Sequence, residues 1–172
     1  MTGKYNRFAS GSGSVPDPES TYDDITRKTA YYAIDAAQQY SQGSSIALPF
    51  VFISCAEAGW PDVPGGSLIE NNLAPEWLQR YLAAKRAVES KLMGSYGPLR
   101  PIIFRPSLIF SYERLPSLPP VGAFFLGNAV GLPFVDRPVT VQALAAAVVN
   151  SLSDVTVSGV QRYKDIDDLS SK

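Results

Sequence analysis

One almost continuously apolar run, residues 46–53, constrains the fold of this chain more than any other feature. A strand that is apolar at every position, rather than at alternate positions, is typical of a parallel sheet that is covered on both faces. Pro49 interrupts the run, and because proline has no backbone N–H to donate, we expect the strand proper to start after it. A second short strand is expected over 101–105, and Pro106 ends it.

Helical segments alternate with these strands. Apolar residues recur at helical spacing over about 22–40, and a long helix is expected over about 74–93, after a Gly/Pro-rich loop at 59–66. Farther along, a helix is expected over 140–152 and a last strand within 155–163, before a polar end. The alternation of strand and helix predicts an α/β fold with a parallel sheet and helical crossovers.

The composition excludes several classes of function. With 172 residues, of which 45% are hydrophobic and 18% charged, the chain can bury a core. Its formal net charge of -1 gives no reason to expect a nucleic-acid partner. Cys55 is the single cysteine and histidine is absent, so we expect neither a disulfide within the chain nor a metal site. The lack of histidine also argues against zinc enzymes and Ser-His-Asp hydrolases.

We expect neither a transmembrane segment nor a targeting segment in this chain. No uninterrupted apolar run reaches the roughly 18–20 residues that cross a bilayer, so no transmembrane segment is expected. The first residues have neither an apolar signal-peptide core nor a long basic amphipathic stretch. Residues 1–20, rich in Gly, Ser and Pro, are expected to form a flexible loop, and 169–172 a polar tail. The folded part is therefore expected to span 21–168.

The residues best suited to chemistry are Tyr81 and Lys85, four positions apart in the expected helix 74–93. Side chains at this spacing share a helix face, so the ammonium can lower the pKa of the phenol from its usual value of about 10, and such a phenol can act as a general acid or base. Ser54, expected at the carboxyl end of the first strand, would hydrogen-bond the reacting oxygen. An ordinary surface helix remains an alternative, because the nine tyrosines and six lysines would give roughly 0.3 such pairs by chance.

Three segments together resemble the short-chain dehydrogenase/reductase superfamily, in its extended and atypical branches. They are Phe52–Cys55, Tyr81–Glu89 and Leu99–Phe110, in the order of a strand ending in Ser, an active-site helix, and a strand ending in Arg-Pro before a nicotinamide loop. Residues 21–30 resemble the helix that precedes them. Within these branches the chain is most similar to a mitochondrial group, which contains the NADPH-binding accessory subunit of respiratory complex I and a fungal dehydratase-like protein of coenzyme Q biosynthesis.

This resemblance implies a fold, a site and a cofactor. The fold would be a partial Rossmann-type parallel sheet, in which residues 21–168 form the carboxyl-terminal part of an NAD(P)-binding domain. Ser54, Tyr81 and Lys85 would take the superfamily's catalytic roles, and Lys85 would also hold the nicotinamide ribose. Hydride transfer would belong to the cofactor.

Two further residues and the cellular setting follow from the same resemblance. Pro106 and Ser107 would line the nicotinamide pocket. The group also implies a mitochondrial location and a partner in a membrane-associated protein complex; without the resemblance, the cytoplasm is the default expectation.

The expected phosphate-binding loop departs from the family pattern. Its only candidate, Gly11-Ser-Gly13-Ser-Val-Pro16, lacks a third glycine and has no apolar strand before it, so a flexible loop is favoured. The first βαβ units are therefore expected to be missing, and we expect the chain to bind NAD(P) weakly or not at all. The sheet would then begin with the strand at Phe50, whose outer edge would be open.

Three functions agree with these patterns. The first is a fragment or divergent member of an NAD(P)-dependent reductase family linked to mitochondrial quinone biosynthesis or respiratory-complex assembly. The second is a non-catalytic assembly subunit that keeps the fold as a binding surface. The third is an enzyme like the nucleotide-sugar epimerases and dehydratases of the extended branch.

Overall fold

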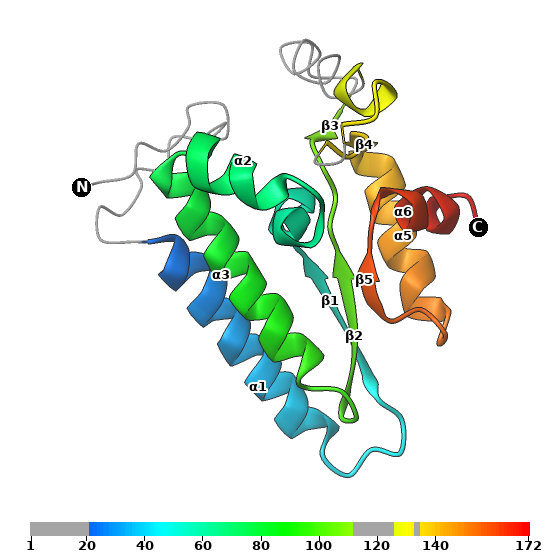
Figure 1. Cartoon of the computed structure of the whole chain (residues 1–172). Helices are drawn as coiled ribbons and strands as arrows, with labels where there is room; N and C mark the ends of the chain where they lie inside the picture. Colours follow the sequence, from blue (N-terminus) through cyan, green and yellow to red (C-terminus); the bar gives the residue numbers. More distant parts are fainter. Residues whose placement is uncertain (1–20, 112–125, 133–134) are drawn as a thin grey trace, which may run out of the picture.

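A parallel sheet with helices on both faces organises the chain (Figure 1). The computed structural model describes residues 21–111, 126–132 and 135–172. Within this part, three strands pair in the order β1-β2-β5, all parallel: β1 (Leu48–Ile53), β2 (Leu99–Phe104) and β5 (Gly159–Gln161). Two short strands, β3 (Ile109–Phe110) and β4 (Val139–Thr140), form a second parallel pair. The expected α/β class with a parallel sheet is confirmed.

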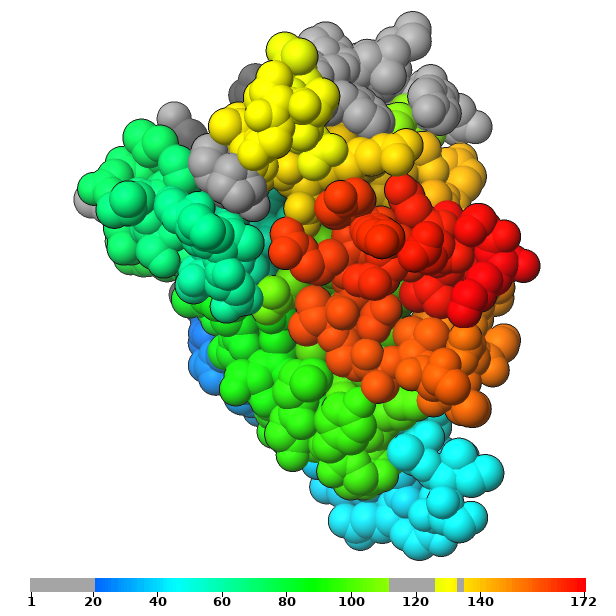
Figure 2. Space-filling view, turned by 45° about the vertical axis from the view of Figure 1, so that its right-hand side comes forward, coloured from blue at the N-terminus to red at the C-terminus, as the bar shows by residue number. Residues whose placement is uncertain are grey.

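The helices divide between the two faces of the sheet. Those described in full are α1 (Thr29–Ser41), α2 (Gly66–Leu73), α3 (Glu76–Met93), α5 (Val141–Ser153) and α6 (Tyr163–Ser170), together with the short stretches η1 (Asp23–Lys28) and η2 (Ala56–Asp62). Buried residues of α1 and α3 form one apolar cluster with the sheet, and those of α5 and α6 form another on the opposite face. In the space-filling view, α5, β5 and α6 form one continuous orange-to-red surface (Figure 2).

The two faces of β1 explain its uninterrupted apolar sequence. Leu48, Phe50 and Phe52 pack against the cluster of α1 and α3, whereas Val51 and Ile53 pack against that of α5 and α6. Side chains of successive strand residues point to opposite faces, so a strand covered on both sides needs apolar residues throughout.

No strand of the described residues pairs with the outer edge of β1. The backbone N–H groups of Leu48 and Ser54 donate to carbonyls of the β2 segment, at 3.1 and 2.7 Å. Alternate N–H groups of a strand point the same way, so those of Val51 and Ile53 face the open edge. Pro49 lies inside the strand, and the expectation that the strand starts after it is wrong. It is tolerated because its missing N–H falls on the unpaired side.

Thr140 begins a helix, as expected. It precedes α5, and its side-chain oxygen accepts a hydrogen bond from the N–H of Ala143, at 3.1 Å. The expected long helix is also present, but it starts at Glu76, and Pro75 is the extended residue before it.

Two segments that were expected to be irregular are partly helical. The loop expected over 59–66 contains most of η2, and α2 follows it directly. The polar end of the chain forms α6, whose Ile166 and Leu169 are buried in the core. The loop expected over 1–20, with the candidate glycines Gly11 and Gly13, lies outside the described residues.

Candidate functional site

Ser54 and Ser107 lie where β1 and β2 end, at the same rim of the sheet. Parallel pairing continues past the strands, because the N–H of Ser54 donates to the carbonyl of Phe104 and that of Ala56 to the carbonyl of Pro106, at 2.7 and 2.8 Å. Ligands of open parallel α/β sheets bind outside the carboxyl ends of the strands. This rim therefore positions two of the predicted site residues where such a fold would bind a ligand.

The hydroxyls of these two serines are buried and unsatisfied. Ser54 is 4% and Ser107 is 8% exposed, and neither hydroxyl oxygen has a hydrogen-bond partner among the described residues. A buried polar group without a partner destabilises a fold by about 1–3 kcal/mol. Unsatisfied groups of this kind suit ligand atoms that would complete their hydrogen bonding.

Lys85 reaches the end of β1 from α3. Its Nζ donates to the carbonyl oxygen of Ile53 at 2.7 Å, and this carbonyl belongs to the residue directly before Ser54. The same atom lies 4.8 Å from the centre of the Phe52 ring. The ammonium is therefore held between the strand end and an aromatic face, where cation–π attraction adds to the hydrogen bond.

Burial sets the protonation of Lys85. Removal from water lowers its pKa, while the nearby Cys55 and Glu89 act in the opposite direction. Burial also raises the pKa of the Cys55 thiol, to about 12. A thiol of this kind stays protonated at neutral pH and is a poor nucleophile.

Tyr81 lies one turn before Lys85 and faces the same rim. Its ring packs edge-on against the ring of Tyr22, with centroids 5.5 Å apart. Burial raises its pKa well above the usual value of about 10, and Cys55 and Glu57 raise it further. The expectation that Lys85 lowers the pKa of this phenol is therefore wrong for the chain as described, because desolvation disfavours the phenolate. At neutral pH Tyr81 is a proton donor.

Glu57 is a member of the rim that the sequence reasoning missed. It lies in η2, three residues after Ser54, and burial raises the pKa of its carboxyl. It forms no ion pair with any described residue. The available signal was a single acid shortly after the expected strand, which is too common a pattern to single out a site residue.

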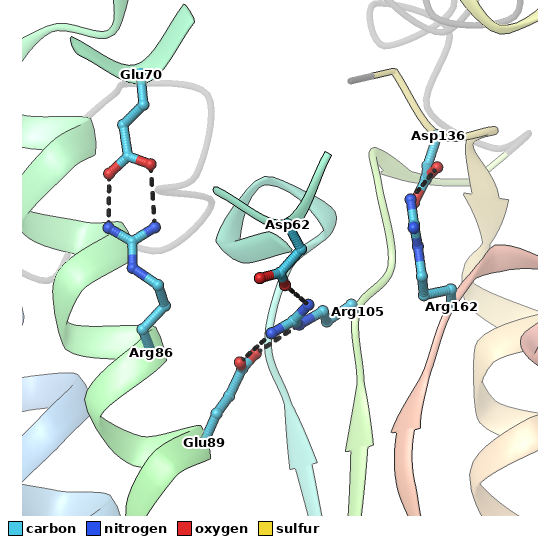
Figure 3. A network of polar contacts seen from close by, with 7 residues as sticks. All are labelled: Asp62, Glu70, Arg86, Glu89, Arg105, Asp136 and Arg162. Carbon is cyan, nitrogen blue, oxygen red and sulfur yellow. Dashed lines mark hydrogen bonds and ion pairs between the residues drawn. The ribbon is translucent and has the colours of Figure 1, made fainter. Parts of the chain in front are cut away.

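Charged side chains tie the surrounding elements together (Figure 3). Arg105, directly after β2, binds both carboxylate oxygens of Glu89 on α3, at 2.7 and 3.1 Å, and Asp62 of η2 at 3.1 Å. Glu70 and Arg86 connect α2 to α3 at 2.6 Å. These contacts fix α3 relative to the strand ends, and therefore fix the helix that carries Tyr81 and Lys85.

A further ion pair joins the segment before β4 to the end of β5. Asp136, which precedes β4, and Arg162, which follows β5, approach to 2.9 Å (Figure 3). Sequence reasoning did not anticipate any of these pairs, because each depends on how strands and helices align in space.

The described residues show no cluster of three or more possible metal ligands. Among the helices described, none is both long enough and apolar enough to cross a membrane.

No family model, no curated protein and no solved structure matches this chain.

Proposed function

We propose that this chain is the carboxyl-terminal part of a Rossmann-type NAD(P)-binding domain, in a fragment or divergent member of the short-chain dehydrogenase/reductase superfamily. The observation that carries the proposal is the position of Lys85, whose ammonium lies 2.7 Å from the carbonyl oxygen of Ile53, the residue directly before Ser54, whose own hydroxyl is unsatisfied. A cation, a hydroxyl and the phenol of Tyr81 then adjoin the carboxyl end of one parallel strand. Together they can bind and protonate a carbonyl oxygen.

Each of the three residues has a distinct role in this proposal. Ser54 donates a hydrogen bond to the carbonyl oxygen of the substrate. Tyr81 gives that oxygen a proton, and its raised pKa keeps the phenol protonated at neutral pH for this purpose. Lys85 exchanges its bond to the Ile53 carbonyl for the ribose hydroxyls of the nicotinamide.

The rim also has residues that fit the nicotinamide half of the cofactor. Ser107 has a buried hydroxyl without a partner, which can bond to a carboxamide, and the neighbouring Pro106 is fully buried beside it. When bound, NAD(P) supplies or accepts the hydride. The candidate phosphate loop at Gly11 and Gly13 lacks a third glycine and an apolar strand before it in the sequence, so binding of the whole dinucleotide by this chain is expected to be weak or absent.

A non-catalytic assembly subunit is the second candidate function, and the open edge of β1 favours it. Every residue of β1 is only partly buried, whereas five of the six residues of β2 are buried. A parallel edge strand with two apolar faces is suited to being covered by another protein. In the mitochondrial setting that the resemblance implies, this protein would belong to a membrane-associated respiratory or quinone-linked complex.

Binding of the two halves of the cofactor tests the first proposal. Reduced nicotinamide mononucleotide and AMP are compared by saturation-transfer NMR, and the nicotinamide compound is also titrated by its own fluorescence. We expect a saturable signal for the nicotinamide half and none for AMP.

Two lysines on α3 provide the matched variants for this experiment. Lys85→Met is expected to abolish nicotinamide binding. Lys91→Met, at a lysine that pairs with Asp35 of α1 at 2.5 Å, is expected to preserve it. Absence of binding to the unmodified chain, or equal signals from the two compounds, would count against a nicotinamide site and leave the assembly role as the better proposal.

A further inference from the structure

Lys85 and Glu89 are placed to pair with each other, yet they do not. They lie four residues apart on α3, the spacing at which opposite charges on a helix commonly form an ion pair. The Lys85 ammonium instead bonds the Ile53 carbonyl. Glu89 is only 7% exposed, so another cation has to compensate its charge.

Arg105 is that cation. Its Nε and Nη2 donate to the two carboxylate oxygens of Glu89, at 3.1 and 2.7 Å. The guanidinium is planar and fits a carboxylate through two parallel hydrogen bonds, which engages both oxygens at once. Arg105 therefore compensates the charge on both oxygens of Glu89, and neither oxygen needs the Lys85 ammonium as a partner.

The position of Arg105 is fixed from two further sides. Asp62 accepts a hydrogen bond from its Nη1 at 3.1 Å. On the other side lies Gly59, where an added Cβ would come 2.7 Å from the same nitrogen. A side chain at position 59 would therefore displace the guanidinium. Gly59 therefore leaves room for the Arg105 guanidinium in the position where it bonds to Glu89.

We propose that Arg105 is a positioning residue that acts on Lys85 through Glu89. By occupying both oxygens of this carboxylate, it leaves the Lys85 ammonium at the carboxyl end of β1, where the ammonium can bind a ligand. The inference rests on the proposed function, because that function makes the carboxyl ends of β1 and β2 a ligand site. The competition between two cations for one carboxylate depends on the geometry alone.

The surroundings of Lys85 explain why this competition matters. The charged or titratable groups that face its ammonium are Glu89 and Tyr81 on α3 and Cys55 after β1, with the Phe52 ring beside them. Among these, Glu89 is the only carboxylate. Without Arg105 it would become a buried charge whose nearest compensation is the ammonium one helical turn away. Lys85 would then leave the Ile53 carbonyl and the ligand site.

The pKa of Lys85 reports which partner the ammonium has. Lysines carrying ¹³C-methyl groups from reductive methylation can be titrated by NMR, and Lys85→Arg identifies the signal. In Arg105→Met we expect the pKa of Lys85 to rise by about one unit, the effect of a close opposite charge. In the double variant Arg105→Met/Glu89→Gln we expect it to return to the wild-type value or below, because the competing carboxylate is gone.

The double variant separates positioning from a merely structural role. If Arg105 only held α3 in place, removing Glu89 as well would restore nothing. A Lys85 pKa that stays at its wild-type value in Arg105→Met, or that remains shifted in the double variant, would overturn the proposal.

Two milder variants cover the case in which Arg105→Met fails to fold. Arg105→Lys keeps the charge but cannot engage both oxygens, and Gly59→Ala pushes the guanidinium away from its place. Both are expected to raise the Lys85 pKa by less than Arg105→Met, and Glu89→Gln added to either should cancel the rise. An unchanged pKa in both would contradict the proposal.

Nicotinamide binding is measured on the same proteins. If the mononucleotide binds, its affinity should fall about tenfold in Arg105→Met, the equivalent of losing one charged contact, and recover in the double variant. If it does not bind to wild type while the pKa pattern holds, the cofactor proposal fails and the role of Arg105 stands.

Discussion

The ammonium of Lys85 lies 2.7 Å from the carbonyl oxygen of Ile53, the last residue of β1. This carbonyl points to the open edge of the sheet, because the even-numbered residues of the strand face β2. At the other end of the edge, Pro49 has no N–H to offer. Both ends of this edge are thus blocked, and between them the backbone groups of Val51 have no partner among the described residues. A lysine and a proline are common devices against edge-to-edge association on exposed edges, and we expect these two to act in that way.

Replacing Lys85 with alanine should make the chain self-associate. The change frees the Ile53 carbonyl and lengthens the edge that can pair with another strand. The free energy of unfolding should change by less than about 2 kcal/mol, because loss of a charged hydrogen bond is offset by relief of a buried ammonium. Sedimentation velocity over a range of concentrations measures the association. Lys91→Ala on the same helix is the control and should leave the chain as it is; equal behaviour of the two variants would contradict the edge argument.

Gly66 should be intolerant of any side chain. A Cβ at this position would lie 2.0 Å from the carbonyl oxygen of Trp60, a backbone atom that cannot move aside. Gly66→Ala should therefore destabilise the chain by about 3 kcal/mol, the upper end of typical overpacking effects. Gly94→Ala is the matched control, since its Cβ would meet backbone oxygens of Lys91 and Ser90 at 3.5 Å. Urea unfolding of both variants makes the comparison, and similar losses of stability would refute the clash.

Strand β1 could be predicted from the sequence because it is covered on both faces and is therefore apolar at every position. The short helix α2 could not, because its pattern is reversed. It buries Glu70, which pairs with Arg86, and exposes Leu68 and Leu73. A helix that turns its acid inward has no apolar face for periodicity to detect.

In the candidate site, too, features set by neighbouring residues in the sequence could be predicted, whereas features set by contacts between distant residues could not. The spacing of Tyr81 and Lys85 on one helix is local, and the sequence reveals it. The raised pKa of Tyr81 depends on burial by groups distant in sequence, among them the ring of Tyr22, so the expectation from helical spacing had the wrong direction. The pairing of Arg105 with Glu89 likewise requires the register between β2 and α3.

Glu57 should make the stability of the chain depend on pH in an unusual direction for a carboxyl group. Burial raises its folded-state pKa above the usual 4.5, so the folded chain binds the proton more tightly than the unfolded chain. Its contribution to stability is full below the unfolded pKa and is lost as pH rises through the folded value. Glu57→Gln should remove this loss, so the variant should gain stability relative to wild type between pH 4 and 7 in urea unfolding. Glu76→Gln, at an exposed carboxylate, is the control, and the same gain there would argue against burial as the cause.

Tyr81 should keep its proton to a higher pH than the exposed tyrosines do. Because burial raises its folded-state pKa, its contribution to stability is present below the unfolded value of about 10 and is lost as pH rises above it. Tyr81→Phe should remove the last phase of tyrosinate formation seen by ultraviolet absorbance, and it should spare nicotinamide binding while abolishing any turnover. Tyr32→Phe, at a ring that is 75% exposed on α1, should leave that last phase intact. If Tyr81 ionises together with the exposed rings, the phenol is not desolvated and its role as a neutral proton donor at the rim has no basis.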